Sequence, residues 1–276
     1  MSLRSLLVAR GTSLQARYRE QLRAQFTAQP LAPAATLTEA DLAHLPAPVQ
    51  RYLRRSGALG QPRPRNVRVE FDARMFRSPG AAAMRASSVQ HNFFAHPARL
   101  FFMKARMFGL PVQVLHVYAG EQATMKVRVA SLVNMVDLAG DELSVGETIT
   151  VLNDMCVFAP GALIDPRLAW EPIDDRTAKV TFVNGGRRGS ATLFFNERDE
   201  LVDFTSDDRA ALLPDGTLRR YRWSTPIEGY REMGGRWVGT RGATVYAYPE
   251  GDFTYGLFVL KAIAFDVAGP PAAGGG

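Results

Sequence analysis

The sequence predicts a mainly β protein of the α+β class, built on one large antiparallel sheet that curls into a half-barrel or a barrel. From residue 66 onward apolar and polar residues alternate with a period of two, the pattern of strands with one buried face. Short turn segments such as SPG and NGG separate these runs, so neighbouring strands are expected to pair antiparallel. A sheet of about a dozen strands is too long to stay flat and should curl.

A basic helix is predicted near the N-terminus. Residues 12–27 carry an apolar residue at every fourth position, which is the spacing of one helix stripe. Arginines occupy the other faces, so we expect this helix to dock on the body of the protein. The alternative is a peripheral contact of residues 1–36 with an anionic membrane or a protein partner. The stripe consists of Leu14, Tyr18, Leu22 and Phe26.

Two short helices are expected before the sheet begins. Thr38 and Asp41 have the spacing of a capping box, and a second helix is expected between Pro48 and Gly57, since proline favours a helix start and glycine a stop. A Pro/Ala-rich linker at 28–36 precedes them. The predicted organisation is a helix and linker at 1–36, one antiparallel-sheet domain at 37–268 and a disordered tail at 269–276.

The strand at 99–107 differs from the others because it carries large apolar groups on both faces. Phe101 and Met103 lie on one face, and Leu100 and Phe102 lie on the other. Both faces are therefore expected to be covered, or one of them lines a cavity. The full set of expected strands is 66–76, 83–93, 99–107, 112–119, 123–130, 132–138, 178–184, 190–196, 201–207, 217–225, 236–248 and 253–267.

One helix interrupts the strands, near residues 144–158. Ser144 and Glu147 have the spacing of a capping box at its start. Its apolar stripe makes it the natural plug for the concave side of the sheet, and the polar Asn153 and Asp154 are placed to face a cavity there. The stripe is Val145, Ile149, Leu152 and Cys156.

Charge and motif content exclude several classes of protein. The net charge is +6, but residues 1–68 hold eleven arginines against three acidic residues, which leaves the remainder at −2. The sheet domain is thus near neutral, which disfavours nucleic-acid binding. The single Cys156 excludes a disulfide framework. Because the sequence contains no nucleophile elbow and no phosphate-binding loop, we predict no cofactor and leave catalysis open, with binding alone preferred.

Metal sites and membrane spans are also not expected. His91 and His96 lie five residues apart but lack a third ligand nearby. No apolar run reaches the roughly 18 to 20 residues of a spanning helix, and the apolar run at the N-terminus is too short for a signal peptide. These features predict a cytoplasmic protein.

Several segments carry a resemblance to known proteins. They are LPAPVQRYLRRSG (45–57), LPVQVLHVYAG (110–120), ETITVLNDMCVFAPGALID (147–165), WEPIDDRTAKVTF (170–182) and FNERDELVDFTSDDR (195–209). In that order they resemble a family of uncharacterised bacterial proteins that bears a domain-of-unknown-function label, over about residues 40–267. That family implies no established activity. At fold level, the sheet with its plug helix is similar to the bacterial lipoprotein-carrier fold, a curved sheet enclosing helices over an apolar cavity.

These observations favour a non-enzymatic protein that holds an apolar or amphipathic small molecule, such as a lipid, in the concavity of the sheet. One alternative is an enzyme on the same scaffold, with Glu147, Asn153, Asp154 and Arg209 as its residues. Another is a structural or interaction module that recruits a partner through residues 1–36. Arg209 is the expected head-group anchor. The expected ligand-binding residues are Phe101, Met103, Met107, His116, Trp170, Arg209 and Trp223.

Overall fold

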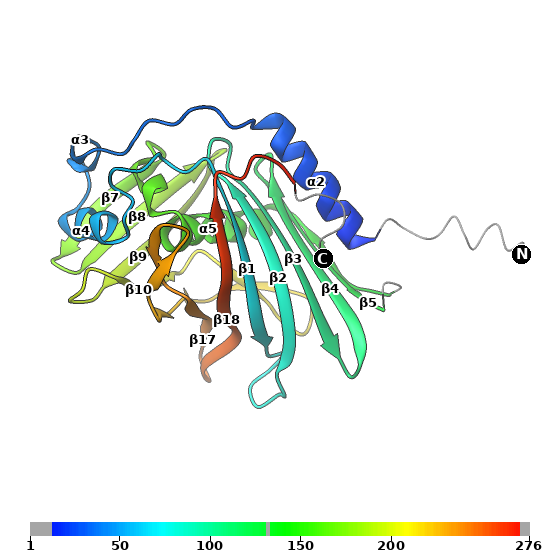
Figure 1. The fold of residues 1–276 in the computed structure, drawn as a ribbon. Helices are drawn as coiled ribbons and strands as arrows, with labels where there is room; N and C mark the ends of the chain where they lie inside the picture. The colour runs from blue at the N-terminus through cyan, green and yellow to red at the C-terminus, as the bar shows by residue number, and fades with distance from the viewer. Residues whose placement is uncertain (1–12, 131–132, 271–276) are drawn as a thin grey trace, which may run out of the picture.

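The computed structural model describes residues 13–130 and 133–270, and strands make up most of its elements (Figure 1). The longer strands are β1 (Asn66–Met75), β2 (Met84–Phe93), β3 (Ala98–Met107), β4 (Leu110–Ala119), β5 (Gln122–Val129), β6 (Val133–Ala139), β7 (Leu168–Asp174), β8 (Thr177–Asn184), β9 (Arg187–Phe195), β10 (Leu201–Ser206), β17 (Arg241–Tyr248) and β18 (Gly251–Phe265). The shorter ones are β11 (Ala210–Leu212), β12 (Leu218–Arg220), β13 (Trp223–Ser224), β14 (Ile227–Glu228), β15 (Arg231–Met233) and β16 (Arg236–Val238).

One 14-stranded antiparallel sheet organises the chain. Its order is β6-β5-β4-β3-β2-β1-β18-β17-β13-β10-β9-β8-β7, with β14 paired to β17. The first and last strands of the domain, β1 and β18, lie side by side, with Val67 opposite Phe265. Within the described residues the edge strands β6 and β7 do not pair, so the sheet curls without closing. The curled antiparallel sheet predicted from the period of two is confirmed.

Helix α5 (Asp141–Phe158) fills the concave side of the sheet. It connects β6 to β7, the two edge strands, and contacts strands of both arms, including β5 and β9. An 18-residue helix is about 27 Å long, enough to cross the concavity from one edge to the other. A short 3₁₀ helix, η1 (Pro160–Ile164), completes the crossing. The plug helix is thus the part of the chain that joins the two edges.

Helix α2 (Leu14–Ala28) covers the outer face of β3 and β4. Its buried Leu14, Tyr18 and Leu22 form one apolar cluster with residues of the sheet, among them Leu100 and Phe102. The Tyr18 hydroxyl also lies 2.7 Å from Nδ1 of the buried His91. This docking explains why β3 is apolar on both faces: the helix covers one face, and the other face turns inward.

Two short helices, α3 (Glu39–Leu42) and α4 (Ala47–Arg55), precede the sheet. The backbone N–H of Thr38 donates to Asp41 Oδ2 at 2.7 Å, as its capping-box spacing predicts. No helix in the described ranges is long and apolar enough to cross a membrane. Residues 271–276 of the predicted tail lie outside the described residues.

Three local expectations from the sequence were wrong. Helix α5 begins at Asp141, so Ser144 lies inside it and does not cap it: its Oγ donates to the Gly140 carbonyl and accepts from the Ala123 N–H. Strand β7 was not among the predicted strands; it is an edge strand, where its Pro172 is tolerated. The runs at 217–225 and 236–248 are each broken into shorter strands.

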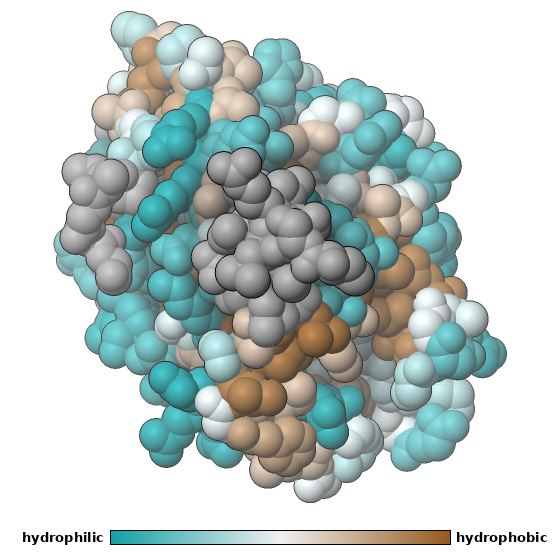
Figure 2. All heavy atoms as spheres, turned by 90° about the vertical axis from the view of Figure 1, so that its right-hand side faces the viewer, coloured by the Kyte–Doolittle hydropathy of each residue, from teal (hydrophilic) through white to brown (hydrophobic). Residues whose placement is uncertain are grey.

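Exposed large apolar residues gather at one end of the sheet. Phe108, Leu110, Val133 and Met135 are each more than half exposed. They lie at the hairpin ends of β3 and β4 and at the start of β6. Figure 2 shows brown, apolar residues in the lower part of the molecule, the end at which these hairpins lie in Figure 1.

Candidate functional site

A cavity of about 440 Å³ lies between helix α5 and the inner face of the sheet. Its wall combines residues of α5 with residues from β1, β3, β4, β5, β17 and β18. Most of the lining is apolar, and it includes Phe71, Phe101, Met103, Val114, Met125 and Phe258. Since these side chains alternate with outward-facing residues along their strands, the period of two that builds the sheet also builds this apolar wall.

The polar part of the cavity centres on Arg99 of β3. This guanidinium donates from Nε to Asp154 Oδ2 at 2.8 Å and from Nη1 to Glu147 Oε2 at 3.1 Å. Its Nη2 donates to Gln90 Oε1 at 2.8 Å. Gln90 and Asn92 of β2 in turn donate to Asp154 Oδ2, each at 2.8 Å. One oxygen of Asp154 therefore accepts three hydrogen bonds from two strands, and these bonds fix α5 to the sheet.

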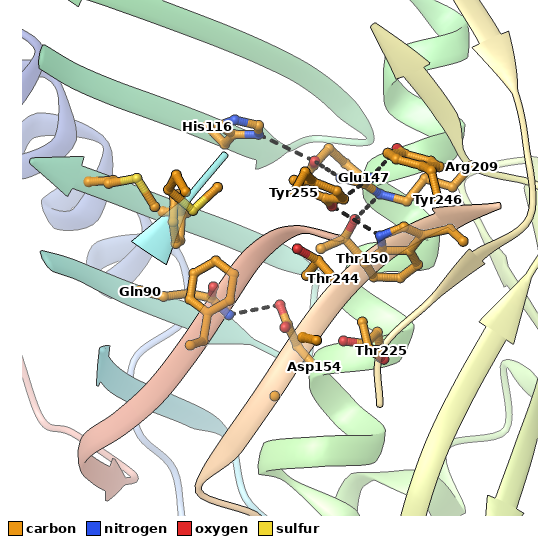
Figure 3. Close-up of a pocket in the computed structure, with 18 of the residues that line it drawn as sticks. Gln90, His116, Glu147, Thr150, Asp154, Arg209, Thr225, Thr244, Tyr246 and Tyr255 are labelled. Atoms are coloured by element: carbon orange, nitrogen blue, oxygen red, sulfur yellow. Dashed lines mark hydrogen bonds and ion pairs between the residues drawn. The ribbon is translucent and has the colours of Figure 1, made fainter. Parts of the chain in front are cut away.

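A second cation, Arg209, follows strand β10 and enters the cavity beside the helix (Figure 3). Its Nε donates to Thr150 Oγ1 at 3.2 Å, and its Nη1 donates to the hydroxyls of Tyr246 and Tyr255. The guanidinium carbon lies 4.5 Å from the centre of the Trp223 ring, a cation–π contact. Arg209 Nη2 lies 4.0 Å from a Glu147 oxygen and makes no hydrogen bond with any described residue.

The two buried carboxyls of α5 have pKa values displaced in opposite directions. Burial disfavours the ionised form of Glu147, yet its neighbours outweigh burial and hold its pKa well below the ordinary 4.5. Those neighbours are Arg99, His116 and Arg209. Burial raises the pKa of Asp154 above 3.8, because Arg99, Asn92 and Gln90 offset it only in part. Opposite displacements of this kind are typical of functional sites.

His116 completes the polar group. Its Nδ1 lies 3.4 Å from Glu147 Oε1, and its ring packs edge-on against Phe101 with 5.9 Å between ring centres. The other ring nitrogen, Nε2, makes no hydrogen bond to the residues that the structure describes. A carboxylate on Nδ1 with a free Nε2 is an arrangement that orients a histidine toward a bound molecule.

Five of the seven expected ligand-binding residues line the cavity. They are Phe101, Met103, His116, Arg209 and Trp223. The other two, Met107 and Trp170, were also expected to line the cavity, but they lie outside it. Met107 lies at the end of β3, beyond the cavity wall, where its sulfur is 3.7 Å from Arg77 Nη1. Trp170 is on the edge strand β7 and donates from Nε1 to the Leu163 carbonyl at 3.3 Å.

Asn153 and Asp154, expected on the cavity side of the helix, also line the cavity. Asn153 donates from Nδ2 to Thr225 Oγ1 at 2.6 Å. Arg99, Gln90 and the two tyrosines that hold Arg209 were not predicted as site residues. Arg99 could have been found from the sequence, because it lies two residues before Phe101 and four before Met103 on β3. Residues at that spacing share one face of a strand, here the inward face.

No group of three or more His, Cys, Asp or Glu side chains in residues 13–130 and 133–270 is placed to hold a metal ion. His91 is instead bonded to Tyr18, on the outer face of the sheet. Cys156 is buried, and burial raises the pKa of its thiol.

Comparison with known proteins places the chain in a family. The profile of the Family of unknown function (DUF6544) matches residues 35–258, so the chain belongs to that family, and the resemblance to an uncharacterised family is confirmed. No curated protein matches the chain.

Three solved structures are similar at a distance. A DUF1329 family protein from Desulfovibrio piger has a TM-score of 0.43 and 11% identity, covering 84% of this chain and 95% of its own. A putative outer membrane lipoprotein-sorting protein domain from Vibrio parahaemolyticus has a TM-score of 0.40 and 7% identity, covering 73% and 85%. A LolA superfamily protein from Nitrosomonas europaea has a TM-score of 0.37 and 11% identity, covering 78% and 92%.

Proposed function

We propose that this member of the DUF6544 family is a binding protein that holds an amphipathic small molecule in the cavity beneath α5, without transforming it. The observation that carries the proposal is the cavity of about 440 Å³, whose apolar wall faces a buried polar group. Ligand pockets in proteins are typically about 300–1,000 Å³, mostly apolar, with a few polar groups that fix orientation. The cavity meets each of these conditions.

The apolar wall suits a flexible hydrocarbon chain. Met75, Met103 and Met125 all line the cavity, and methionine side chains adapt to irregular shapes because they are unbranched and polarizable. Burial of each methylene group contributes about 0.8 kcal/mol. A chain of several methylenes therefore gains useful affinity from the wall alone.

Arg209 is the proposed partner of the ligand's polar end. Its Nε and Nη1 are held by Thr150, Tyr246 and Tyr255, while Nη2 has no hydrogen-bond acceptor among the described residues. Because the bonds on one side of the guanidinium fix its plane, Nη2 is oriented before a ligand arrives. An oxygen of a carboxylate or hydroxyl head group can then accept a charge-assisted hydrogen bond from it.

Calorimetric titration with saturated fatty acids of increasing length, and with the matching alcohols, tests this proposal. Affinity is expected to rise about fourfold with each added methylene until the cavity is full, as about 0.8 kcal/mol per group implies. Arg209→Met should lower the affinity for the fatty acids more than the affinity for the alcohols. Met103→Trp, which fills the cavity, should abolish binding, while the matched Val183→Trp on the exposed face of β8 should not. Equal binding to both tryptophan variants would contradict the proposal.

A second candidate function is general acid–base catalysis on an amphipathic substrate. The observation that favours it is the convergence of Glu147, Asp154 and His116 on one cavity, with the two carboxyl pKa values displaced in opposite directions. p-Nitrophenyl esters of fatty acids distinguish the two candidates. Catalysis predicts repeated release of p-nitrophenol and fatty acid, with loss of turnover in Asp154→Asn and His116→Gln. Binding alone predicts capture of the ester without turnover.

A further inference from the structure

The cavity reaches the surface at the end of the sheet where the exposed apolar residues gather. Its lining includes Met75 and Phe76, at the last paired position of β1 and just beyond it, and the following Arg77. It also includes Tyr248 and Phe253, which flank the β17–β18 turn. We call this end of the molecule the mouth.

The hairpin ends beside the mouth present apolar side chains to solvent. Phe108, in the β3–β4 turn, is 89% exposed, and Leu110 beside it is 51% exposed. Val133 and Met135, at the same end of β6, are 57% and 61% exposed. The register connects them, because Val112 of β4 is opposite Val129 of β5, which is opposite Val133. Exposed apolar side chains grouped in this way mark an interaction surface.

Basic residues surround these apolar ones. The strand ends and turns at 74–85, 104–113, 126–130, 133–137 and 248–253 contain seven lysines and arginines and three acidic residues. Arg74 of β1 lies directly opposite Arg85 of β2. Ala86 pairs with Ala105, so Arg106 lies beside Arg85 on the next strand. Like charges on neighbouring strands repel one another, and a nearby anion relieves that repulsion.

Four arginines at the mouth, Arg74, Arg77, Arg85 and Arg106, have no carboxylate partner among the described residues. Arg74 stacks over Phe76, and Arg77 lies over Phe108. Arg106 donates to the Gly109 carbonyl. Elsewhere on the surface, exposed arginines such as Arg54 and Arg220 pair with glutamates. The mouth therefore combines exposed apolar side chains at the hairpin ends with four arginines that lack a carboxylate partner among the described residues.

We propose that the mouth is a docking surface for an anionic phospholipid bilayer. Phe108 and its apolar neighbours enter the interface between head groups and acyl chains, and the arginines contact the phosphates. The positive charge of the mouth favours an anionic bilayer over a neutral apolar partner. Because the exposed apolar side chains lie beside the open end of the cavity, their insertion places that end against the lipid. This inference goes beyond the proposed function, because ligand binding in solution can hold while bilayer docking fails.

Co-sedimentation of the full chain with vesicles tests the proposal. The chain is expected to bind vesicles of phosphatidylglycerol and phosphatidylcholine, and not vesicles of phosphatidylcholine alone. Added salt should weaken the binding. The variant Arg85→Gln/Arg106→Gln should bind about fivefold more weakly for each arginine removed, equivalent to about 1 kcal/mol each. The matched control is Arg188→Gln/Arg231→Gln, which removes two exposed arginines that do not line the cavity and should bind as the parent does.

A label at the tip tests the depth of docking. The thiol of the Phe108→Cys variant is labelled with a nitrobenzoxadiazole fluorophore. Its emission should strengthen and shift to the blue when anionic vesicles are added. The same label at Val183→Cys should not respond. Cys156 is buried and its thiol pKa is raised, so it stays unlabelled in both variants.

Three outcomes would overturn the proposal. They are unchanged vesicle binding by Arg85→Gln/Arg106→Gln, a label at position 108 that stays in water, and an absence of vesicle binding by the parent. If that absence came with a dimer that Phe108→Ser/Leu110→Ser converts to a monomer, the surface would be assigned to a second copy of this chain.

Discussion

Arg99 of strand β3 and Asp154 of helix α5 are joined by a hydrogen bond of 2.8 Å between two buried side chains. The same guanidinium reaches Glu147, seven residues earlier on the helix. Residues seven apart lie two turns apart on one helix face, so a single arginine holds that face against the sheet. This contact fixes both the rotation of the plug helix and the polar end of the cavity.

Removal of Arg99 should therefore destabilise the fold. Arg99→Met leaves two buried carboxylates without their main counter-charge, and breaking buried pairs in this way costs about 3–5 kcal/mol. Urea denaturation measures the change in the free energy of unfolding. The control is Arg106→Met on the same strand, whose exposed side chain should change stability by less than about 0.5 kcal/mol. Equal stabilities of the two variants would refute the role given to Arg99.

The two carboxyls of α5 should contribute to the pH dependence of stability with opposite signs. The folded pKa of Glu147 is lowered, so its contribution is present above the unfolded value of 4.5 and is lost as the pH falls through the folded pKa. The folded pKa of Asp154 is raised, so its contribution is full below 3.8 and is lost as the pH rises through the folded pKa.

Denaturation of Glu147→Gln and Asp154→Asn between about pH 3 and pH 7 tests these signs. As the pH rises, the parent should gain stability relative to Glu147→Gln and lose stability relative to Asp154→Asn. Parallel profiles for the two variants would show that the carboxyls do not differ in this way.

The docked helix α2 should be part of the stable fold. Leu22 is buried against the outer face of the sheet, and Leu22→Ala is expected to cost about 2–5 kcal/mol, as cavity-forming substitutions do. The neighbouring Arg23 is exposed, and Arg23→Ala should be nearly neutral. If Leu22→Ala were neutral as well, the helix would detach freely, and its contact with the sheet would not contribute to folding.

Gly189 of β9 and Ile149 of α5 lie so close that substitutions at the two positions should affect stability non-additively. A Cβ atom at Gly189 would lie 2.2 Å from Ile149 Cδ1, so Gly189→Ala should cost about 1–3 kcal/mol by overpacking. Ile149→Val removes Cδ1, and the glycine substitution should cost less in that background. Thermal unfolding of the four proteins in this cycle measures the coupling. Strict additivity would contradict the close approach.

Most of the fold could be predicted from the sequence, since the period of two is imposed locally by each strand's buried face. Residues 66–75 alternate so regularly that β1 follows directly. Strand β7 could not be found this way, because Pro172 is tolerated only by virtue of an edge position that depends on the whole sheet. The start of α5 was missed because Ser144 bonds to Gly140 and Ala123 rather than capping the helix.

The candidate site was predicted less completely than the fold. Phe101 and Met103 were predicted because they alternate along one face of β3, and Arg209 was expected as a charged anchor for a head group. The pairing of Arg99 with Glu147 and Asp154 joins residues about 50 positions apart, and only the register and the rotation of α5 bring them together. Trp170 was misplaced for the same reason, because its strand was not recognised.

Native mass spectrometry of the chain purified from its own host asks whether the cavity holds a ligand. The protein should carry an added mass that organic extraction releases as an amphipathic molecule. Met103→Trp, purified in parallel, should lack that mass, while Val183→Trp should retain it. A bare protein mass for the parent, together with fatty-acid titrations that show no dependence on chain length, would contradict the proposed function.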